Sequence, residues 1–152
     1  MDTNIIEREV AIEAPIERVW SLITQAEHLG TWFGDAGAEI DLRPGGALQV
    51  HWQEGDHTLV GTVDAVEPTS RFAFRWHQLD TPAGADLTEQ NSTLVEFSLT
   101  SEGDTTHVRV VESGFGSLAL PENERVEMHA DHSGGWPVEL GHLQAHAAGV
   151  AA

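Results

Sequence analysis

A chain of 152 residues has the length of one domain, and its 40% apolar content is sufficient for a hydrophobic core. The formal net charge is −18, all seven basic residues are arginine, and there is no cysteine. This composition excludes disulfides, cysteine-type zinc sites and Schiff-base lysine chemistry, and so acidic a surface argues against nucleic acid and membranes as partners.

The first predicted elements are one strand and two short helices. Apolar residues alternate with others over Ile5–Ile12, which is typical of a strand. Ala14-Pro15 then opens a helix, because proline suits the first helical position. The apolar residues with helical spacing are Ile16, Val19, Trp20 and Ile23. A second short helix is predicted over Ala26–Trp32 and ends near Gly34.

The middle of the chain predicts six strands, because apolar and polar residues alternate between turns rich in Gly, Pro and Asp. The predicted strands are Ala38–Leu42, Leu48–Gln53, His57–Val66, Arg71–His77, Ser92–Ser101 and Thr105–Ser113. The turns are at Arg43-Pro44-Gly45-Gly46, Glu54-Gly55-Asp56, Glu67-Pro68-Thr69-Ser70 and Glu102-Gly103-Asp104, and Asp80–Asn91 is predicted to be a loop. The hairpin signals favour antiparallel pairing.

The last predicted element is a long helix that follows Leu118–Pro121. Its apolar stripe consists of Met128, Trp136, Leu140 and Leu143. Gly134-Gly135 and Pro137 interrupt this stripe and predict a kink or a break. Gly149 is a plausible end for the helix.

This order of elements predicts an α+β fold in a single domain that spans residues 1–152. One strand, two short helices, about six antiparallel strands and a long helix fit a curved antiparallel sheet with the C-terminal helix across its concave face. The five tryptophans fall in different predicted elements, at Trp20, Trp32, Trp52, Trp76 and Trp136. They are expected to converge on one apolar interior, which is either a packed aromatic core, the commoner case, or the wall of a pocket.

Several short motifs resemble, in their order and spacing, the START-related helix-grip (SRPBCC) superfamily, and within it the branch named after the activator of Hsp90 ATPase. They are Ala14-Pro15 with Val19-Trp20, Glu27-His28-Leu29 with Trp32-Phe33, Pro44-Gly45-Gly46, Gly61 with Val63 and Glu67-Pro68, Phe74-Arg75-Trp76, Glu112-Ser113-Gly114-Phe115, and Gly135-Trp136 with Leu140 and Leu143.

The resemblance implies a helix-grip fold with a cavity between the sheet and the long helix. It implies no single activity, because members of the superfamily bind lipids, hormones and polyketides, and a few are cyclases, hydrolases or self-sacrificing resistance proteins. Hsp90 activation is not carried over, because the eukaryotic activator has a second domain with no counterpart in these residues.

Glu112 is the polar residue of most interest, because it shares a predicted inward strand face with Val108 and Val110. A buried carboxylate needs a partner, for which Arg75 or a histidine would serve. It could act as a general base or orient a ligand. The commoner case is a structural hydrogen bond to the loop at Gly114, or a position in solvent near the strand end.

Metal and nucleophile chemistry find little support. His129 with His132, and His142 with His146, are spaced to share helical faces, but no third ligand is evident and no H-E-x-x-H pattern occurs. Ser113 lies near Glu112 without a nucleophile elbow around it. We therefore expect no metal and no cofactor, and assign no catalytic residue.

The leading hypothesis is a small cytoplasmic protein that holds an apolar or aromatic molecule between sheet and helix. The expected lining residues are Trp32, Phe33, Trp52, Phe74, Trp76, Phe97, Glu112, Phe115, Trp136 and Leu140. The alternatives are a cyclase- or hydrolase-type enzyme that uses Glu112 as its base in the same pocket, and a chaperone-associated interaction module. An exposed convex sheet face could support a homodimer.

The N-terminal segment, MDTNIIEREV, lacks the basic and apolar regions of a signal peptide, which underlies the cytoplasmic expectation. The acidic, lysine-free surface suits high ionic strength, where screening relieves self-repulsion. A coding bias that replaces lysine with arginine is the plainer explanation. Adaptation to high ionic strength predicts that the stability of the fold rises with salt concentration.

Overall fold

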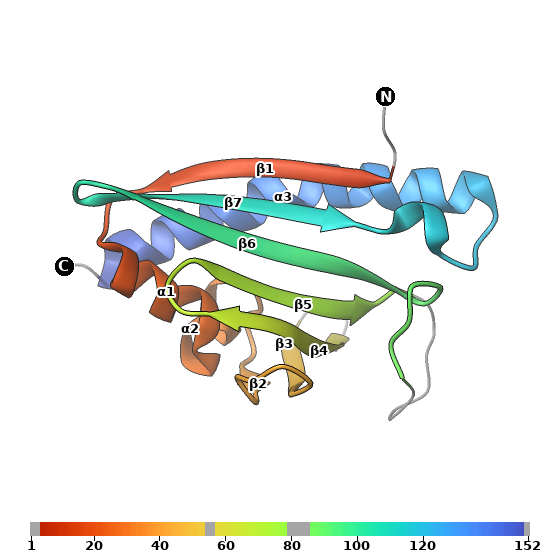
Figure 1. The fold of residues 1–152 in the computed structure, drawn as a ribbon, viewed down its shortest axis with the longest axis horizontal. Coiled ribbons are helices and arrows are strands. Elements are labelled where there is room, and N and C mark those ends of the chain that lie inside the picture. The colour runs from red at the N-terminus through yellow and green to blue at the C-terminus, as the bar shows by residue number, and fades with distance from the viewer. Residues whose placement is uncertain (1–3, 54–56, 79–85, 151–152) are drawn as a thin grey trace.

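The computed structural model describes residues 4–53, 57–78 and 86–150. The fold is the predicted α+β arrangement, a curved antiparallel sheet with a long C-terminal helix and two short helices (Figure 1). The strands are β1 (Ile5–Ile12), β2 (Ala38–Ile40), β3 (Ala47–Trp52), β4 (His57–Glu67), β5 (Arg71–His77), β6 (Ser92–Glu102) and β7 (Thr105–Ser113). The helices are α1 (Ile16–Thr24), α2 (Ala26–Trp32), the 3-10 turn η2 (Phe115–Ser117) and α3 (Glu122–Val150).

The seven strands form one sheet in the order β1-β7-β6-β5-β4-β3-β2, and every neighbouring pair is antiparallel. The predicted strands agree with it to within two residues at each end. The register of β4 against β5 shifts between Val63 and Ala65, and such a bulge bends a strand and increases its twist. The predicted turn at residues 54–56, and residues 80–85 of the predicted loop, lie outside the described residues.

Helix α3 corrects one prediction. It runs from Glu122 to Val150 without the break predicted at Gly134-Gly135 and Pro137. Proline has no N–H, so it leaves the carbonyl of the residue four positions earlier, Ser133, without its helical partner. Arg8 of β1 donates to that carbonyl from Nη2 at 3.3 Å, which compensates part of the loss.

Tertiary packing explains why the helix continues. Four apolar side chains of α3 are buried against the rest of the protein, and burial of this kind outweighs local helix propensity. They are Trp136, Leu140, Leu143 and Ala147. Two polar side chains of α3 also bond to carbonyls of the edge strand β1: His129 Nε2 to Ile5 at 2.9 Å and Gln144 Nε2 to Ala11 at 3.0 Å. The long helix is therefore fixed along β1.

Helices α1 and α2 connect β1 to β2 and pack near the C-terminal part of α3 (Figure 1). Val19, Leu22 and Ile23 of α1 are fully buried. The ring nitrogens of His28 in α2 and His146 in α3 are 2.9 Å apart. The described part of the chain holds no helix with the length and hydrophobicity to cross a membrane.

Candidate functional site

The site is built around Glu112, whose side chain is fully buried near the end of β7. Strand residues alternate between the two faces of a sheet, so Glu112 points to the same side as Val108 and Val110, which are also fully buried. The prediction that this strand face points inward is confirmed. The predicted loop contact is not its partner: Gly114 N–H donates to the Asn4 carbonyl, and the carboxylate is bonded elsewhere.

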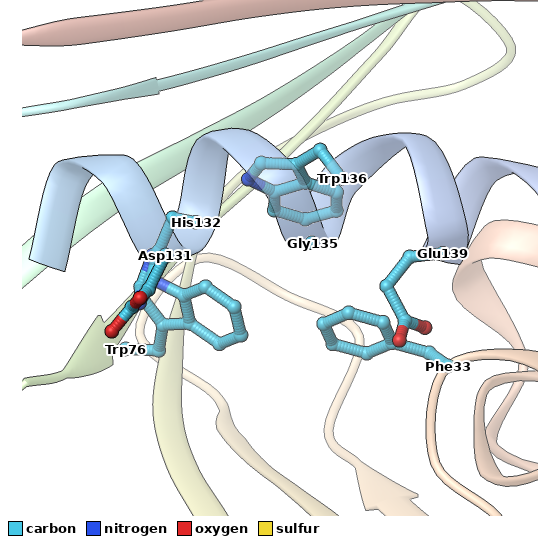
Figure 2. Close-up of a pocket in the computed structure, with 7 residues that line it drawn as sticks. All are labelled: Phe33, Trp76, Asp131, His132, Gly135, Trp136 and Glu139. Carbon is cyan, nitrogen blue, oxygen red and sulfur yellow. The ribbon is translucent and has the colours of Figure 1, made fainter.

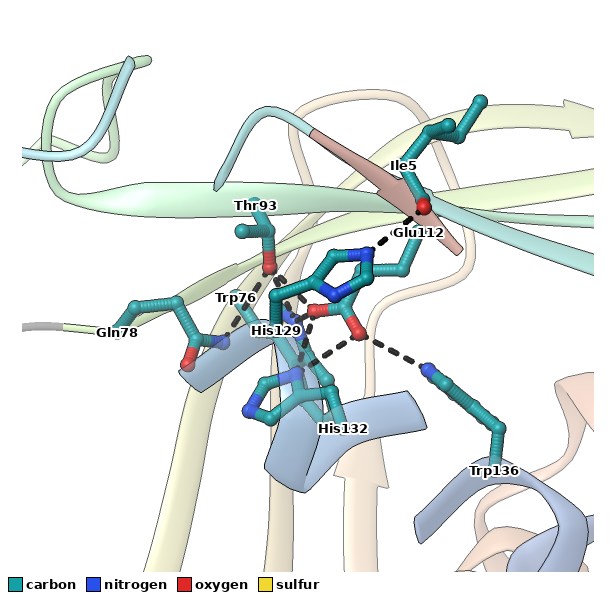
Figure 3. Close-up of polar contacts among 8 residues, drawn as sticks. All are labelled: Ile5, Trp76, Gln78, Thr93, Glu112, His129, His132 and Trp136. Carbon is teal, nitrogen blue, oxygen red and sulfur yellow. Dashed lines mark hydrogen bonds and ion pairs between the residues drawn. The ribbon is translucent and has the colours of Figure 1, made fainter. Parts of the chain in front are cut away.

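Four side chains donate hydrogen bonds to the Glu112 carboxylate (Figure 3). On the sheet, Trp76 Nε1 and Thr93 Oγ1 lie 2.8 and 2.6 Å from Oε2. On α3, Trp136 Nε1 lies 2.9 Å from Oε1, and His132 Nδ1 lies 2.8 and 2.9 Å from the two oxygens. One carboxylate thus joins β5, β6 and β7 to the long helix.

The register of the sheet brings the strand partners together. Trp76 pairs with Thr93 across β5 and β6, and Val95 pairs with Glu112 across β6 and β7. Thr93 and Val95 are two residues apart, so all four share one face. This face is the one that α3 covers.

These bonds decide what Glu112 can do. Both of its oxygens accept bonds from protein donors, so it has no free lone-pair direction for a substrate proton. A carboxylate only accepts, so His132 must carry its hydrogen on Nδ1 when it bonds to Glu112. The expected histidine partner is confirmed, whereas Arg75 bonds to Ser92 instead.

Phe33 occupies the centre of the aromatic cluster at this end of the sheet. Its ring is stacked on Trp136 with the centroids 5.9 Å apart and an angle of 8°, and on Trp76 at 5.7 Å and 26°. Trp52 and Phe74 meet its ring more steeply, at 5.7 and 6.5 Å. Much of the expected cavity is therefore filled by the protein's own aromatic rings.

A close approach of backbones holds Phe33 in this place. A Cβ on Gly34 would lie 2.6 Å from the carbonyl oxygen of His51 in β3, which is closer than real Cβ atoms come. Only glycine lets the end of α2 rest directly on β3. The neighbouring Phe33 side chain is thereby directed under α3.

A pocket of about 150 Å³ is left between this cluster and α3 (Figure 2). Its apolar wall consists of Phe33, Trp76 and Trp136. Its other lining residues, all on α3, are Asp131, His132, Gly135 and Glu139. A Cβ on Gly135 would meet no atom within 4 Å, so the glycine leaves open space in the pocket.

The two carboxylates of the pocket lie at opposite ends of it, Asp131 beside Trp76 and Glu139 beside Phe33 (Figure 2). The Oε2 atom of Glu139 is buried and has no hydrogen-bond partner. The imidazole Nδ1 of His142 lies 3.6 Å from this oxygen, which is too long for a hydrogen bond. Burial raises the pKa of the Glu139 carboxyl, and His142 offsets part of this effect.

The ten residues expected to line a cavity fall into three groups. Phe33, Trp76 and Trp136 line the pocket, and Glu112 lies behind it, bonded to two of them. Trp52 is half-buried and packs against Phe33. The remaining five are buried in the core outside the pocket lining: Trp32, Phe74, Phe97, Phe115 and Leu140.

Sequence reasoning missed four pocket residues, all on α3. Asp131, Gly135 and Glu139 recur every four residues, and His132 is four before Trp136. On a helix, residues four apart share a face. Once Trp136 was expected to point inward, that spacing could have placed the others around the same opening.

The histidines of α3 each have a separate partner. His129 bonds to the backbone of β1, His132 to Glu112, and His146 to His28, while His142 lies beside Glu139. Burial and the proximity of His28 lower the pKa of His146. Within residues 4–53, 57–78 and 86–150, no three His, Asp or Glu side chains gather as metal ligands would.

Solved structures with the same fold come from several bacteria. Protein MLL2253 from Mesorhizobium loti is 23% identical over 93% of this chain and 94% of its own, with a TM-score of 0.74. The Aha1 dimer from Colwellia psychrerythraea is 18% identical over 92% of both chains, with a TM-score of 0.69. DynU16, a protein from the dynemicin biosynthetic locus, is 24% identical over 94% of this chain but 46% of its own, with a TM-score of 0.72.

Among proteins with curated descriptions, no sequence matches this chain significantly. Residues 13–148 match the profile of the family described as Activator of Hsp90 ATPase homolog 1-like protein. The match covers most of the sequence, and it agrees with the fold and with the motifs noted above. The chain therefore belongs to the Activator of Hsp90 ATPase homolog 1-like family, a branch of the helix-grip superfamily.

Proposed function

We propose that this protein binds one small apolar or aromatic molecule in the pocket between the sheet and α3. The observation that carries the proposal is the pair of pocket tryptophans, Trp76 and Trp136, whose indole N–H groups are both fixed by the buried Glu112. The occurrence of DynU16, a structural relative, in a biosynthetic locus fits a role in small-molecule binding.

A network around a buried carboxylate is often no more stable than an apolar core of the same volume. Burying a charge requires desolvation, and well-packed apolar residues often give equal or greater stability. Here the charge orients two aromatic side chains at a pocket, and fixed walls reduce the entropy lost on binding. The network is thus explained by preorganisation of the site.

The size of the pocket limits the ligand. About 150 Å³ is the volume of an engineered protein cavity that holds benzene, so the pocket suits one aromatic ring or an aliphatic group of that size. A larger ligand would have to extend out of the pocket or displace Phe33, the ring that separates the pocket from Trp52 and Phe74.

Two neighbouring glycines allow a matched test. Gly135→Leu fills the pocket, whereas Gly134→Leu adds the same side chain at an exposed position with no atom within 4 Å of its Cβ. Leucine favours a helix over glycine by about 0.8 kcal/mol, so both variants should fold. The probe is benzyl alcohol, and the readout is the NMR signals of the tryptophan indole N–H groups.

Benzyl alcohol is expected to shift the Trp76 and Trp136 signals in the wild type and in Gly134→Leu, and to leave Gly135→Leu unchanged. Equal shifts in the two variants would place the binding elsewhere. If no aromatic probe shifted either signal in the wild type, the proposed function would be wrong.

A second candidate is acid–base catalysis by His132, favoured by its bond to Glu112. Glu112 is enclosed by its four donors, so the general base predicted at that residue is better assigned to the histidine, which lines the pocket itself. A carboxylate bonded to Nδ1 fixes the tautomer and leaves Nε2 to accept a proton. Glu112 is then a positioning residue.

Hydrolysis of p-nitrophenyl acetate tests this candidate. His132→Gln should abolish the catalysed rate, and Glu112→Gln should change its pH dependence. His107→Gln is the control for unspecific hydrolysis by exposed imidazoles, since His107 is exposed on β7, bonds to Glu102 and does not line the pocket. Equal rates for His132→Gln and His107→Gln would rule out the catalytic role.

A further inference from the structure

The pocket contains one polar atom that the protein leaves unsatisfied. Glu139 Oε2 is buried without a hydrogen-bond partner, in a side chain that is 25% exposed, and it lies at the Phe33 end of the pocket (Figure 2). Among the described residues that are not solvent-exposed, no other buried side-chain oxygen or nitrogen lacks a partner. A ligand that donates to this oxygen would remove the cost of leaving it unpaired.

The charges around the pocket favour a positive ligand. Asp131 and Glu139 both line it, no arginine does, and His142, whose Nδ1 lies 3.6 Å from Glu139, is outside the lining. His132 is committed through Nδ1 to the Glu112 carboxylate, so any positive charge it carries is already compensated. The net charge of −18 adds an attractive field for cations around the whole molecule.

The aromatic walls of the pocket also attract a cation. Phe33, Trp76 and Trp136 are aromatic, and the negative face of an aromatic ring attracts a cation. Tryptophan is the strongest of these partners, and partial exclusion of water strengthens the interaction. A cationic group between aromatic walls and a carboxylate would thus be favoured by both.

We propose that the ligand is a small organic cation: a ring-sized apolar body that rests against Trp76 and Trp136 and carries an ammonium group that donates to Glu139. This inference rests on the proposed function, which requires only that the pocket hold an apolar molecule. It adds the charge of the ligand and the residue that recognises it.

Three probes of similar size distinguish a preference for cations from binding of any apolar molecule. They are benzylamine as the cation, benzyl alcohol as the neutral analogue and benzoate as the anion. Their binding is measured at about 0.15 M salt, where weak long-range attraction is largely screened. Benzylamine should bind about tenfold more tightly than benzyl alcohol, since charge-assisted hydrogen bonds are the stronger class, and benzoate should bind most weakly.

Glu139→Gln tests the residue, and Glu122→Gln is its matched control. Both remove one negative charge from α3, but Glu122 is exposed at the N-terminal end of the helix, about 25 Å away along the axis. Glu139→Gln should bring benzylamine and benzyl alcohol to within about twofold of each other, while Glu122→Gln should keep the wild-type preference.

Equal binding of benzylamine and benzyl alcohol to the wild type would overturn the cation inference and leave the proposed function standing. A preference for benzylamine that survived in Glu139→Gln would also overturn the cation inference, because the general acidity of the surface would then explain that preference. If none of the three probes shifted the Trp76 and Trp136 signals, both proposals would fail.

Discussion

Glu112 on β7 and Trp136 on α3 are joined by a hydrogen bond of 2.9 Å between the carboxylate Oε1 and the indole N–H. The same carboxylate holds Trp76 of β5 at 2.8 Å. A single buried charge therefore fixes the distance between sheet and helix at the point where the pocket opens. The stability of the fold and the shape of the pocket should depend on this one group.

Glu112→Gln should lower the free energy of unfolding by about 2–4 kcal/mol. Each carboxylate oxygen accepts from at least two donors, so the amide N–H₂ of glutamine would face donors whichever way it turned. Urea unfolding monitored by tryptophan fluorescence measures the change. Glu102→Gln, at an exposed ion pair with His107, is the control and should change stability by less than about 0.5 kcal/mol.

A double-mutant cycle of Glu112→Gln with Trp136→Phe should show a coupling energy of about 1 kcal/mol or more, because phenylalanine keeps an aromatic ring but removes the donor. Additive effects would mean that the bond between the two residues contributes little and that the cluster is held by packing alone.

Arg8 and Pro137 should be energetically coupled through the Ser133 carbonyl. Arg8→Met keeps the aliphatic part of the side chain but removes the donor, and should cost about 1 kcal/mol in the wild type. In a Pro137→Ala background the backbone N–H of residue 137 can donate to the Ser133 carbonyl. Arg8→Met should then lower the free energy of unfolding by less. Thermal unfolding of the four proteins measures the coupling, and an identical cost in both backgrounds would contradict the explanation given for the unbroken helix.

Glu139 should destabilise the folded protein as pH rises. Its pKa is raised above 4.5 by burial, so its favourable contribution is present below about pH 4.5 and is lost as pH increases through the folded-state value. Glu139→Gln should therefore be more stable than the wild type at pH 7, by on the order of 1 kcal/mol, and equally stable near pH 4. Unfolding curves of both proteins across this range give the difference, and one that stayed constant with pH would refute the assignment.

Stability should rise with ionic strength because the net charge is −18. Salt also weakens surface ion pairs such as Arg109 with Glu7, but exposed pairs of this kind contribute little. The free energy of unfolding is expected to increase by on the order of 1 kcal/mol between about 0.05 and 1 M NaCl. A flat or falling response in that series would remove salt adaptation as an explanation of the composition.

The sequence patterns predicted the strands well because strand alternation has a period of two and needs no tertiary information. The inward direction of Glu112 followed from the same rule. A histidine partner was expected, but the identity of the donors did not follow, since Trp76, Thr93 and His132 are brought to Glu112 by strand register and by the rotation of α3, which a single sequence does not encode locally.

The continuity of α3 was mispredicted for a physical reason. Gly134-Gly135 and Pro137 are unfavourable in an isolated helix, but the burial of Trp136 and Leu140 on the sheet compensates for them. The two glycines also have open space around them, and Gly135 thereby leaves room for the pocket.

The most direct test of ligand binding is native mass spectrometry of the protein purified from its own organism, alongside Gly135→Leu and Gly134→Leu produced in the same host. We expect a small adduct on the wild type and on Gly134→Leu that is lost on denaturation, and a bare polypeptide mass for Gly135→Leu. An adduct retained by Gly135→Leu, or bare masses for all three proteins, would contradict this expectation.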